Sequence, residues 1–171
     1  MVSILSLDGP AARAATPALA GILVDAVAHG ASVNFLAGFS QAEGEVFWGG
    51  QMAAIEAGSR VLLVAELDGR IVGTVVVTFA QQPNGPHRAE IGKMLVHSSA
   101  RRRGLGSRLL QAAEDVVRAS GRTLAHLDTQ TGSAGEALYR ARGWTEMGVM
   151  PGHSLTPDGR LASATFFYKQ V

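Results

Sequence analysis

The chain has 171 residues, of which 47% are hydrophobic and 17% are charged, and its formal net charge at pH 7 is +1. A length and composition of this kind favour one folded domain, residues 1–171, and exclude a disordered chain. The nearly neutral balance argues against nucleic acid or an acidic membrane surface as the main partner. Because the chain has no cysteine, disulfide bonds, thiolate nucleophiles and cysteine metal sites are excluded.

The beginning of the chain carries no sign of a targeting segment. The first ten residues, MVSILSLDGP, lack the basic region and the long apolar core of a signal peptide. No uninterrupted apolar run has the length of a transmembrane helix, and no group of His, Asp and Glu has the spacing of metal ligands. We therefore expect a cytoplasmic protein that binds neither membrane nor nucleic acid and needs no metal.

The N-terminal part of the chain predicts a strand and then a helix. The short apolar segment at residues 2–7 predicts the strand. Residues 16–30 predict the helix, because Thr16 is a suitable N-cap and Pro17 suits the first helical position. Gly30 is then expected to end this helix.

A second helix is expected to follow. Ser40 and Glu43 have the spacing of a capping box, which indicates a helix start. The pattern continues to about Gly58, although Gly49 and Gly50 weaken the middle of this helix.

The middle of the chain changes to strand-forming sequence. Residues 60–80 contain two strand-like runs joined by Asp68 and Gly69, which is a strong signal for a hairpin. The remaining sequence predicts strands at 89–96, 123–129, 145–150 and 164–171 and helices at 105–120 and 133–142. Mixed strands and helices with several hairpins predict an α/β or α+β fold whose sheet is mixed rather than fully parallel.

The stretch ARRRGLGS joins a predicted strand to a predicted helix. Glycines in such a turn let the backbone approach a ligand closely, and the free N–H groups of a helix start favour an anion. Arginine side chains add charge-assisted hydrogen bonds, so phosphate or pyrophosphate is the expected guest. The residues expected to form this binding loop are Arg101, Arg102, Arg103, Gly104, Leu105, Gly106 and Ser107.

Other interpretations of this turn are less consistent with the sequence. A Walker A loop requires a Lys that is absent here. A dinucleotide fingerprint requires a third glycine, where this chain has Leu109. An ordinary helix start with solvated arginines remains the alternative.

Two motifs together resemble the GNAT family of N-acetyltransferases. Arg101, Gly104 and Gly106 match the Arg-x-x-Gly-x-Gly pattern of the coenzyme A pyrophosphate loop in that family. Tyr139 and the Gly-Trp pair at 143–144 match its Tyr-x-x-x-Gly-aromatic segment. The order of predicted strands and helices also matches. The resemblance implies a single-domain fold with a mostly antiparallel sheet flanked by about four helices, and acetyl-CoA as the cosubstrate.

A narrower resemblance, over about residues 28 to 168, is to the tabtoxin resistance group of these acetyltransferases. It is carried by the segments GASVNFLAGF, AAIEAGS, QQPNGPHRAE, LAHLDTQTGSAGEALY and PGHSLTPDGRL. It implies a small amino-acid-like amine as acceptor, with the β-lactam toxin tabtoxinine as one candidate. Family members are often dimers, so the resemblance leaves a homodimer open.

The family resemblance also implies which residues bind acetyl-CoA. The backbone of Met94, Leu95 and Val96 would pair with the pantetheine amides, and an N–H near Leu95 would stabilise the oxyanion. The loop from Arg101 to Ser107 would bind the pyrophosphate.

One position departs from the family pattern. An Asn often lies seven residues before the family's Tyr, and this chain has Gly132 there. The corresponding contact to the pantetheine arm is then either missing or supplied by Thr129 or Ser133. Tyr139 itself is the candidate acid that protonates the leaving thiolate, with packing of the short helix as the alternative role.

Glu90 and Asp128 are the candidate bases. Each is an acid within a strand-forming segment, which is unusual unless the acid is paired or functional. Burial would raise a carboxyl pKa towards a value useful for removing a proton. The alternatives are a salt bridge of Glu90 with Arg88 or Lys93, a helix cap by Asp128, or binding of the acceptor ammonium by both acids. His126 lies on the same strand as Asp128 and is more typical of a core histidine.

Several functions fit parts of this pattern. An acetyl-CoA-dependent N-acetyltransferase uses the loop, both acids and the tyrosine. A catalytically silent CoA-binding module would need only the loop, and an acetyltransferase for an aminoglycoside, a polyamine or a protein N-terminus would use the same donor. A nucleic-acid binder would need a wider basic face than the net charge supports.

Overall fold

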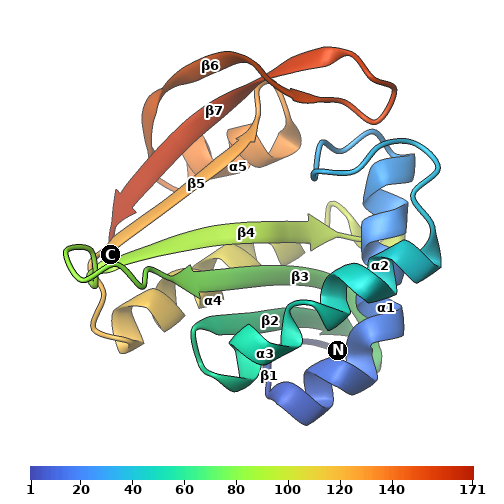
Figure 1. Cartoon of the computed structure of the whole chain (residues 1–171), viewed down its shortest axis with the longest axis horizontal. Helices are drawn as coiled ribbons and strands as arrows, with labels where there is room; N and C mark the ends of the chain where they lie inside the picture. The colour runs from blue at the N-terminus through green and yellow to red at the C-terminus, as the bar shows by residue number, and fades with distance from the viewer.

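A seven-stranded sheet with the order β1-β2-β3-β4-β5-β7-β6 forms the centre of the computed structural model, which describes residues 1–171 (Figure 1). The strands are β1 (Val2–Leu7), β2 (Arg60–Leu67), β3 (Arg70–Phe79), β4 (Arg88–Val96), β5 (Leu124–Gln130), β6 (Thr145–Leu155) and β7 (Leu161–Gln170). The helices are α1 (Gly9–Ala28), α2 (Gln41–Gly49), α3 (Met52–Glu56), α4 (Leu105–Ala119) and α5 (Ala134–Ala141), with a 3₁₀ turn, η1, at Ser98–Ala100. Only β4 and β5 pair in parallel. The predicted α/β fold with a mixed, mostly antiparallel sheet is therefore confirmed.

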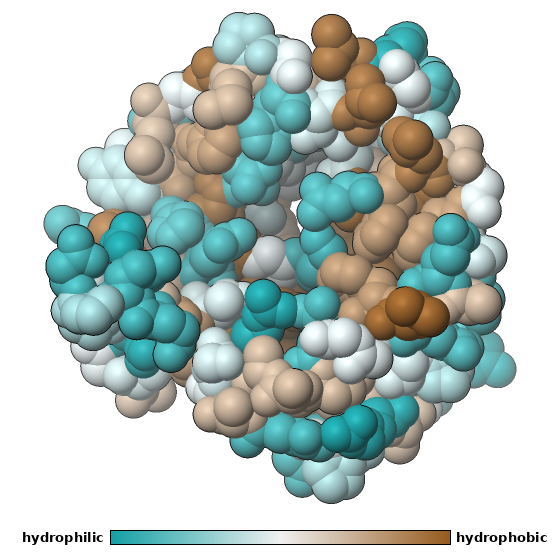
Figure 2. Space-filling model, viewed as in Figure 1, coloured by the Kyte–Doolittle hydropathy of each residue, from teal (hydrophilic) through white to brown (hydrophobic).

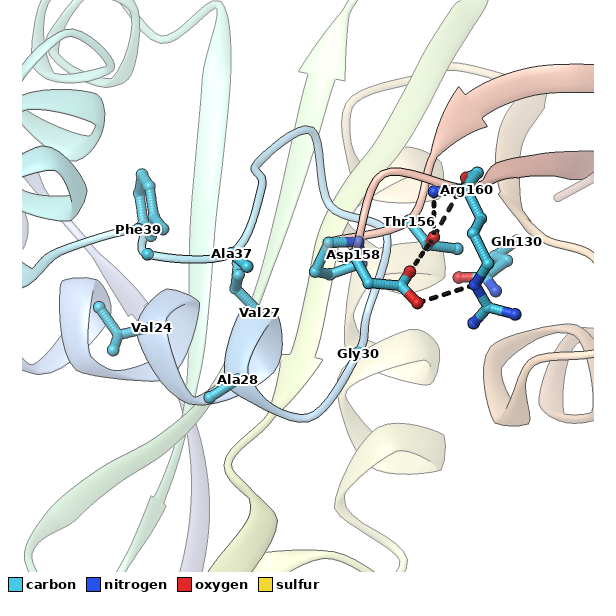
Figure 3. A pocket seen from close by; sticks show the side chains of 12 residues that line it. Val24, Val27, Ala28, Gly30, Ala37, Phe39, Gln130, Thr156, Asp158 and Arg160 are labelled. Atoms are coloured by element: carbon cyan, nitrogen blue, oxygen red, sulfur yellow. Dashed lines mark hydrogen bonds and ion pairs between the residues drawn. The ribbon is translucent and has the colours of Figure 1, made fainter.

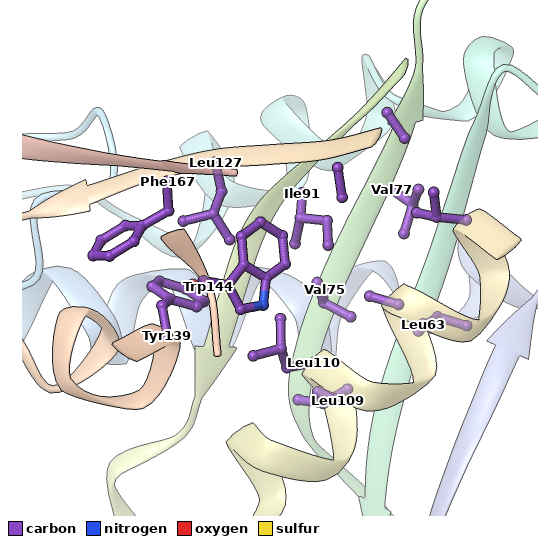
Figure 4. Close-up of a cluster of buried hydrophobic side chains, with 14 of the residues drawn as sticks. Leu63, Val75, Val77, Ile91, Leu109, Leu110, Leu127, Tyr139, Trp144 and Phe167 are labelled. Atoms are coloured by element: carbon purple, nitrogen blue, oxygen red, sulfur yellow. The ribbon is translucent and has the colours of Figure 1, made fainter. Parts of the chain in front are cut away.

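Helices cover both faces of this sheet. On one face α1, α2 and α3 pack against strand residues such as Leu62 and Val64. On the other face α4 and α5 pack against the alternate residues, such as Leu63 and Val75, in the cluster shown in Figure 4. Because successive side chains of a strand point to opposite faces, strands with few polar residues can fill both cores.

Helix α1 begins at Gly9, well before the predicted start. Asp8 is the N-cap, and its side chain accepts a hydrogen bond from an N–H of the first turn at 2.9 Å. Pro10 occupies the first turn, where proline is favoured, whereas Pro17 lies inside the helix. The prediction of Thr16 as N-cap is therefore wrong, because Asp8 with Pro10 supplies an earlier and better start.

Helix α1 is also long and apolar enough to cross a membrane by length and composition, since its most apolar 18-residue window has a mean hydropathy of 1.3. In the structure its large apolar side chains, such as Leu19 and Leu23, are fully buried in the domain core. A core helix that is packed on one face by a sheet has this character too.

The second predicted helix is present as two shorter helices. The capping box of Ser40 and Glu43 forms as predicted at the start of α2. The chain then breaks at Gly50 and Gln51, because glycine weakens a helix interior, and continues as α3. The predicted hairpin between β2 and β3 also forms, with Asp68 and Gly69 at positive φ as a two-residue turn requires.

The last two strands are longer than predicted. β6 pairs with β7 over most of its length, but the register shifts between Glu146 and Gly148 and again between Met150 and Ser154. These irregularities interrupt the alternation of apolar and polar residues on which a strand prediction depends.

The parallel pair β4 and β5 separates after three residue pairs, the last of which is Glu90 with His126. Beyond that point the two strands diverge, as the view in Figure 1 shows. On its other side β4 has a bulge, because Thr74 pairs with Leu95 whereas Val76 pairs with Gly92. The half of β4 that follows Glu90 therefore has no strand partner on the β5 side, which opens the sheet at its centre.

Candidate active site

A small cavity of about 160 Å³ lies where β4 and β5 diverge. It is lined by Ser32, Val33 and Asn34 before α2, by Glu90, Ile91, Gly92, Lys93, Met94 and Leu95 of β4, by Asp128 and Thr129 of β5, and by Tyr139 of α5. Figure 2 shows a hollow in this face of the molecule, at the place where Figure 1 has the gap between the two strands. We call this cavity the central cavity. The structure thus brings the three candidate catalytic residues Glu90, Asp128 and Tyr139 into one site.

Tyr139 supplies a buried phenol to the central cavity. Its side chain is 5% exposed and packs against Trp144 and Phe167, with ring centroids 5.9 and 5.8 Å away (Figure 4). Its hydroxyl is directed at the Met94 Sδ, 3.9 Å away, which is a weak acceptor. Burial, and after it the charge of Asp128, raises the pKa of the phenol. Tyr139 therefore keeps its proton at ordinary pH, and its hydroxyl is available as a hydrogen-bond donor in the cavity.

Glu90 and Asp128 lie on the two diverging strands and are both exposed to solvent. The burial expected for these acids is therefore not found. Neither acid forms an ion pair, so a salt bridge of Glu90 with Arg88 or Lys93 is not found either. Both carboxylates are consequently open to an acceptor that enters the cavity.

The helix after β5 does not use Asp128 as its cap. Ser133 is the N-cap of α5 and accepts the Glu136 N–H at 3.1 Å. The Thr129 and Ser133 hydroxyls lie 3.1 Å apart, and only Thr129 lines the central cavity. Thr129 is thus the better placed of the two to replace the missing Asn contact.

Lys93 also lines the central cavity, although the sequence suggested it only as a salt-bridge partner for Glu90. It lies in the β4 bulge with a φ of 48°, a conformation that is uncommon for a residue other than glycine. Its ammonium is 5.4 Å from the centre of the Phe47 ring. Burial lowers the pKa of this ammonium, and the charges of Asp128 and Glu90 oppose that effect. A lysine within a strand-forming segment was the sequence signal that could have identified it.

The Arg-Gly turn has the geometry of an anion site. Helix α4 starts at Leu105, close to the predicted position, and Gly104 is an N-cap with a φ of 75° and no side-chain hydrogen bond. The first N–H of this helix that bonds within the chain is that of Arg108, which donates to the Gly104 carbonyl. The N–H groups of residues 102–107 have no acceptor in the protein. A run of unpaired donors at a helix start fits the pyrophosphate of a coenzyme.

The side chains of this turn do not all face a ligand. Arg101 donates from Nε to the Val96 carbonyl at 3.1 Å, and its Nη2 is 3.7 Å from Asp25. Arg101 therefore holds the turn in place, and the Val96 carbonyl already accepts one hydrogen bond within the protein. Leu105 is buried in the core, so only its backbone N–H is available to a ligand. Arg102 is exposed, as is its neighbour at position 103, and both are free to reach an anion.

A wider pocket of about 460 Å³ lies between the end of α1 and the loop that joins β6 to β7 (Figure 3). The two sides are joined by a hydrogen bond of 2.9 Å from the Ala37 N–H to the Pro157 carbonyl. Asp158 lines this pocket and is ion-paired with Arg160 at 2.7 Å. Asp158 and Gly159 form a turn between β6 and β7, in which Gly159 has a positive φ. The segments before α2 and after β6 thus form one connected cover beside the central cavity.

Comparisons with known proteins agree with this geometry. The model of the acetyltransferase (GNAT) family matches residues 25–144. The yncA protein of Salmonella typhimurium, an acetyltransferase solved with acetyl-CoA, is similar over 99% of this chain and 94% of its own, with 20% identity and a TM-score of 0.79. A ribosomal-protein-alanine N-acetyltransferase from Brucella melitensis is similar over 99% of both chains, with 23% identity and a TM-score of 0.79. A structure described as a phosphinothricin N-acetyltransferase covers 99% of this chain and 98% of its own, with 19% identity and a TM-score of 0.78.

Proposed function

Because the chain belongs to the acetyltransferase (GNAT) family and is an acetyl-CoA-dependent N-acetyltransferase, we propose that its acceptor is the amine of a small amino-acid-like molecule. The observation that carries this proposal is the central cavity, where Glu90, Asp128 and Tyr139 converge in about 160 Å³. Pockets for drug-sized ligands occupy roughly 300–1,000 Å³. The space beside these residues therefore suits a small acceptor.

The cover of this site also favours a small molecule over a protein. Ser32, which lines the central cavity, donates its hydroxyl to the Leu155 carbonyl at 3.2 Å. Together with the bond between Ala37 and Pro157, this contact ties the segment before α2 to the loop after β6. These contacts fix the segment that supplies Ser32 to the wall of the central cavity, which favours an acceptor small enough to fit the cavity as it stands.

The residues of this chain can perform the proton transfers that the reaction needs. Unpaired N–H groups of residues 102–107 bind the pyrophosphate, and the open edge of β4 after Glu90 is available to the amides of the pantetheine arm. When bound, acetyl-CoA supplies the acetyl group as a thioester. Glu90 or Asp128, directly or through water, removes a proton from the acceptor ammonium. The nitrogen then forms a bond to the acetyl carbon, and the bond from carbon to sulfur breaks as Tyr139 donates its proton to the departing sulfur. The nitrogen loses its second proton to solvent as the amide forms, and the Tyr139 phenolate regains a proton from solvent.

Two sources support the amino-acid-like acceptor. One is the set of segments that resemble the tabtoxin resistance group, from which tabtoxinine-β-lactam is one candidate. The other is the similar structure described as a phosphinothricin N-acetyltransferase, whose name specifies a small amino acid. The similar ribosomal-protein-alanine N-acetyltransferase supports the competing class of acceptor, a protein N-terminus.

The test is release of CoA thiol from acetyl-CoA by the purified protein. The panel should contain tabtoxinine-β-lactam, the common α-amino acids, polyamines, aminoglycosides and a peptide with a free N-terminal alanine. We expect release with one or a few α-amino acids or with the toxin. Release only with the peptide or a polycation would replace the acceptor class, and tight acetyl-CoA binding without release would support a silent binding module.

A further inference from the structure

A second cavity, of about 200 Å³, adjoins the central cavity and shares Glu90, Gly92 and Lys93 with it. We call it the side cavity. Its other walls come from α2, the turn that follows α2, β2 and β3, and they include Trp48, Gln51, Arg60 and Thr78. The proposed transfer reaction assigns no step to Trp48 or Arg60.

The side cavity carries an excess of positive charge. Arg60 and Lys93 line it, and Glu90 is its only acid. Neither cation has a carboxylate within 4.0 Å, because no ion pair of the chain includes Arg60 or Lys93. Arg60 donates to the Gln51 Oε1, a neutral partner, and the Lys93 ammonium lies over the Phe47 ring, 5.4 Å from its centre. Two partly buried cations without an anion indicate a place for an external one.

A buried donor without an acceptor lies in the same wall. Trp48 is 0% exposed, and its indole Nε1 has no hydrogen-bond partner. The other tryptophan differs, because the Trp144 Nε1 donates to the Glu114 carboxylate at 2.9 Å. Buried polar groups are nearly always satisfied, and an unsatisfied donor requires an explanation such as a missing ligand.

The backbone of β4 holds Lys93 between the two cavities. The bulge that follows Gly92 gives Lys93 its positive φ, and the side chain then lines both spaces. An acceptor whose amine lies beside Glu90 and Asp128 would therefore have Lys93 as its nearest cation. In an α-amino acid the ammonium and the carboxylate are attached to the same carbon, so they could occupy the two adjoining cavities at once.

We infer that the side cavity binds the carboxylate of the acceptor through Lys93, Arg60 and Trp48. This inference rests on the proposed function, since it specifies which amines that site accepts. An α-amino acid with a free carboxylate is the preferred class, and its carboxamide or its decarboxylated amine is a poor acceptor.

Carboxylate binding can be measured without any acetyl transfer. Sodium propionate, a carboxylate without an amine, should be titrated into the CoA-loaded protein while the two indole N–H signals are followed by NMR. We expect the Trp48 signal to shift and the Trp144 signal, which is already bonded internally, to stay. Lys93→Met and Arg60→Met should weaken this response by about tenfold or more, because each removes a charged hydrogen bond. Arg70→Met, at an exposed and unpaired arginine of β3, should leave the response unchanged.

Acceptor selectivity gives the second readout. For any amino acid that the protein acetylates, kcat/KM of the free acid should exceed that of its carboxamide, and Lys93→Met should remove most of this ratio. Lys93→Arg should restore part of it. A wild-type protein that acetylates the acid and the amide equally, with no shift of the Trp48 signal, would overturn the inference and leave the acetyltransferase intact. Propionate binding without acetylation of any amine would support the side cavity and remove the proposed acceptor class.

Discussion

Two helix starts, those of α4 and α5, border the opening of the sheet. They differ in whether their backbone N–H groups have acceptors within the protein. At the start of α5, Gly132 donates its N–H to the Glu136 carboxylate at 2.6 Å, and the Ser133 hydroxyl accepts the N–H of Glu136. At the start of α4, no side chain caps the helix, and the N–H groups of residues 102–107 are unpaired. The N–H groups at the start of α5 are thus bonded within the protein, whereas those at the start of α4 are free. In the proposed reaction α5 contributes Tyr139, and the start of α4 binds the pyrophosphate.

The largest effect on acetyl-CoA binding is expected from a change that distorts the start of α4, where the backbone N–H groups are unpaired. Gly104 has a φ of 75°, so Gly104→Val strains the turn and moves the N–H groups that follow it. Loss of two or more hydrogen bonds to a charged pyrophosphate should weaken acetyl-CoA binding by about a hundredfold or more, as measured by calorimetry.

Gly121→Val is the matched control, because Gly121 follows the other end of α4, has a φ of 74° and also has free space around it. It should lower stability by a similar amount and leave acetyl-CoA affinity unchanged. Equal loss of affinity in both variants would mean that strain in α4, and not the N–H array, explains the effect.

The second expected effect concerns chemistry at α5. Tyr139→Phe removes the phenolic proton and keeps the ring packing with Trp144 and Phe167. Turnover should fall by roughly 10²-fold, which is the lower range for a general acid, while acetyl-CoA affinity is retained. Tyr168→Phe, at the other, exposed tyrosine, should have no effect. Unchanged turnover in Tyr139→Phe would leave Tyr139 a packing residue only.

A smaller effect is expected from removing the cap at the start of α5, where the N–H groups are bonded within the protein. Ser133→Ala removes the N-cap of α5 and should lower the free energy of unfolding by about 1 kcal/mol, or Tm by roughly 2–4 °C. Because this helix start serves the fold, acetyl-CoA affinity should stay at the wild-type value. A large loss of affinity would show that Ser133 contacts the coenzyme, as the resemblance allowed.

The smallest effect is expected from removing an exposed charge beside the start of α4. Arg102→Gln removes a solvated cation, which is worth a roughly two- to fivefold change in acetyl-CoA affinity at low salt. This difference should shrink as salt is added, because exposed charges are screened. A loss that persists in high salt would instead indicate a direct, desolvated contact.

Local signals in the sequence predicted the parts of the fold that depend on neighbouring residues. The Asp68-Gly69 hairpin and the capping box at Ser40 are of this kind, because each needs only a few adjacent residues to form. The start of α1 was misplaced because Thr16 and Pro17 carry the same local signal as the pair that acts, Asp8 and Pro10.

Features that depend on distant contacts were not predictable in this way. The folding back of Arg101 onto Val96 and Asp25 joins segments far apart in the chain. The placement of Lys93 depends on the β4 bulge, which arises from pairing with β3 and has no local sequence signal. The candidate acids were found as residue types, but their exposure depends on where β4 and β5 separate.

The most direct test of this account is to identify the acetylated product by mass spectrometry after incubation of the protein with acetyl-CoA and the acceptor panel. The account predicts one acetyl group on the amine of a small α-amino acid or of the toxin, with the yield lowered by Tyr139→Phe. Binding of acetyl-CoA at the start of α4 with no acetylated small molecule, or with the acetyl group only on the peptide or a polyamine, would contradict it.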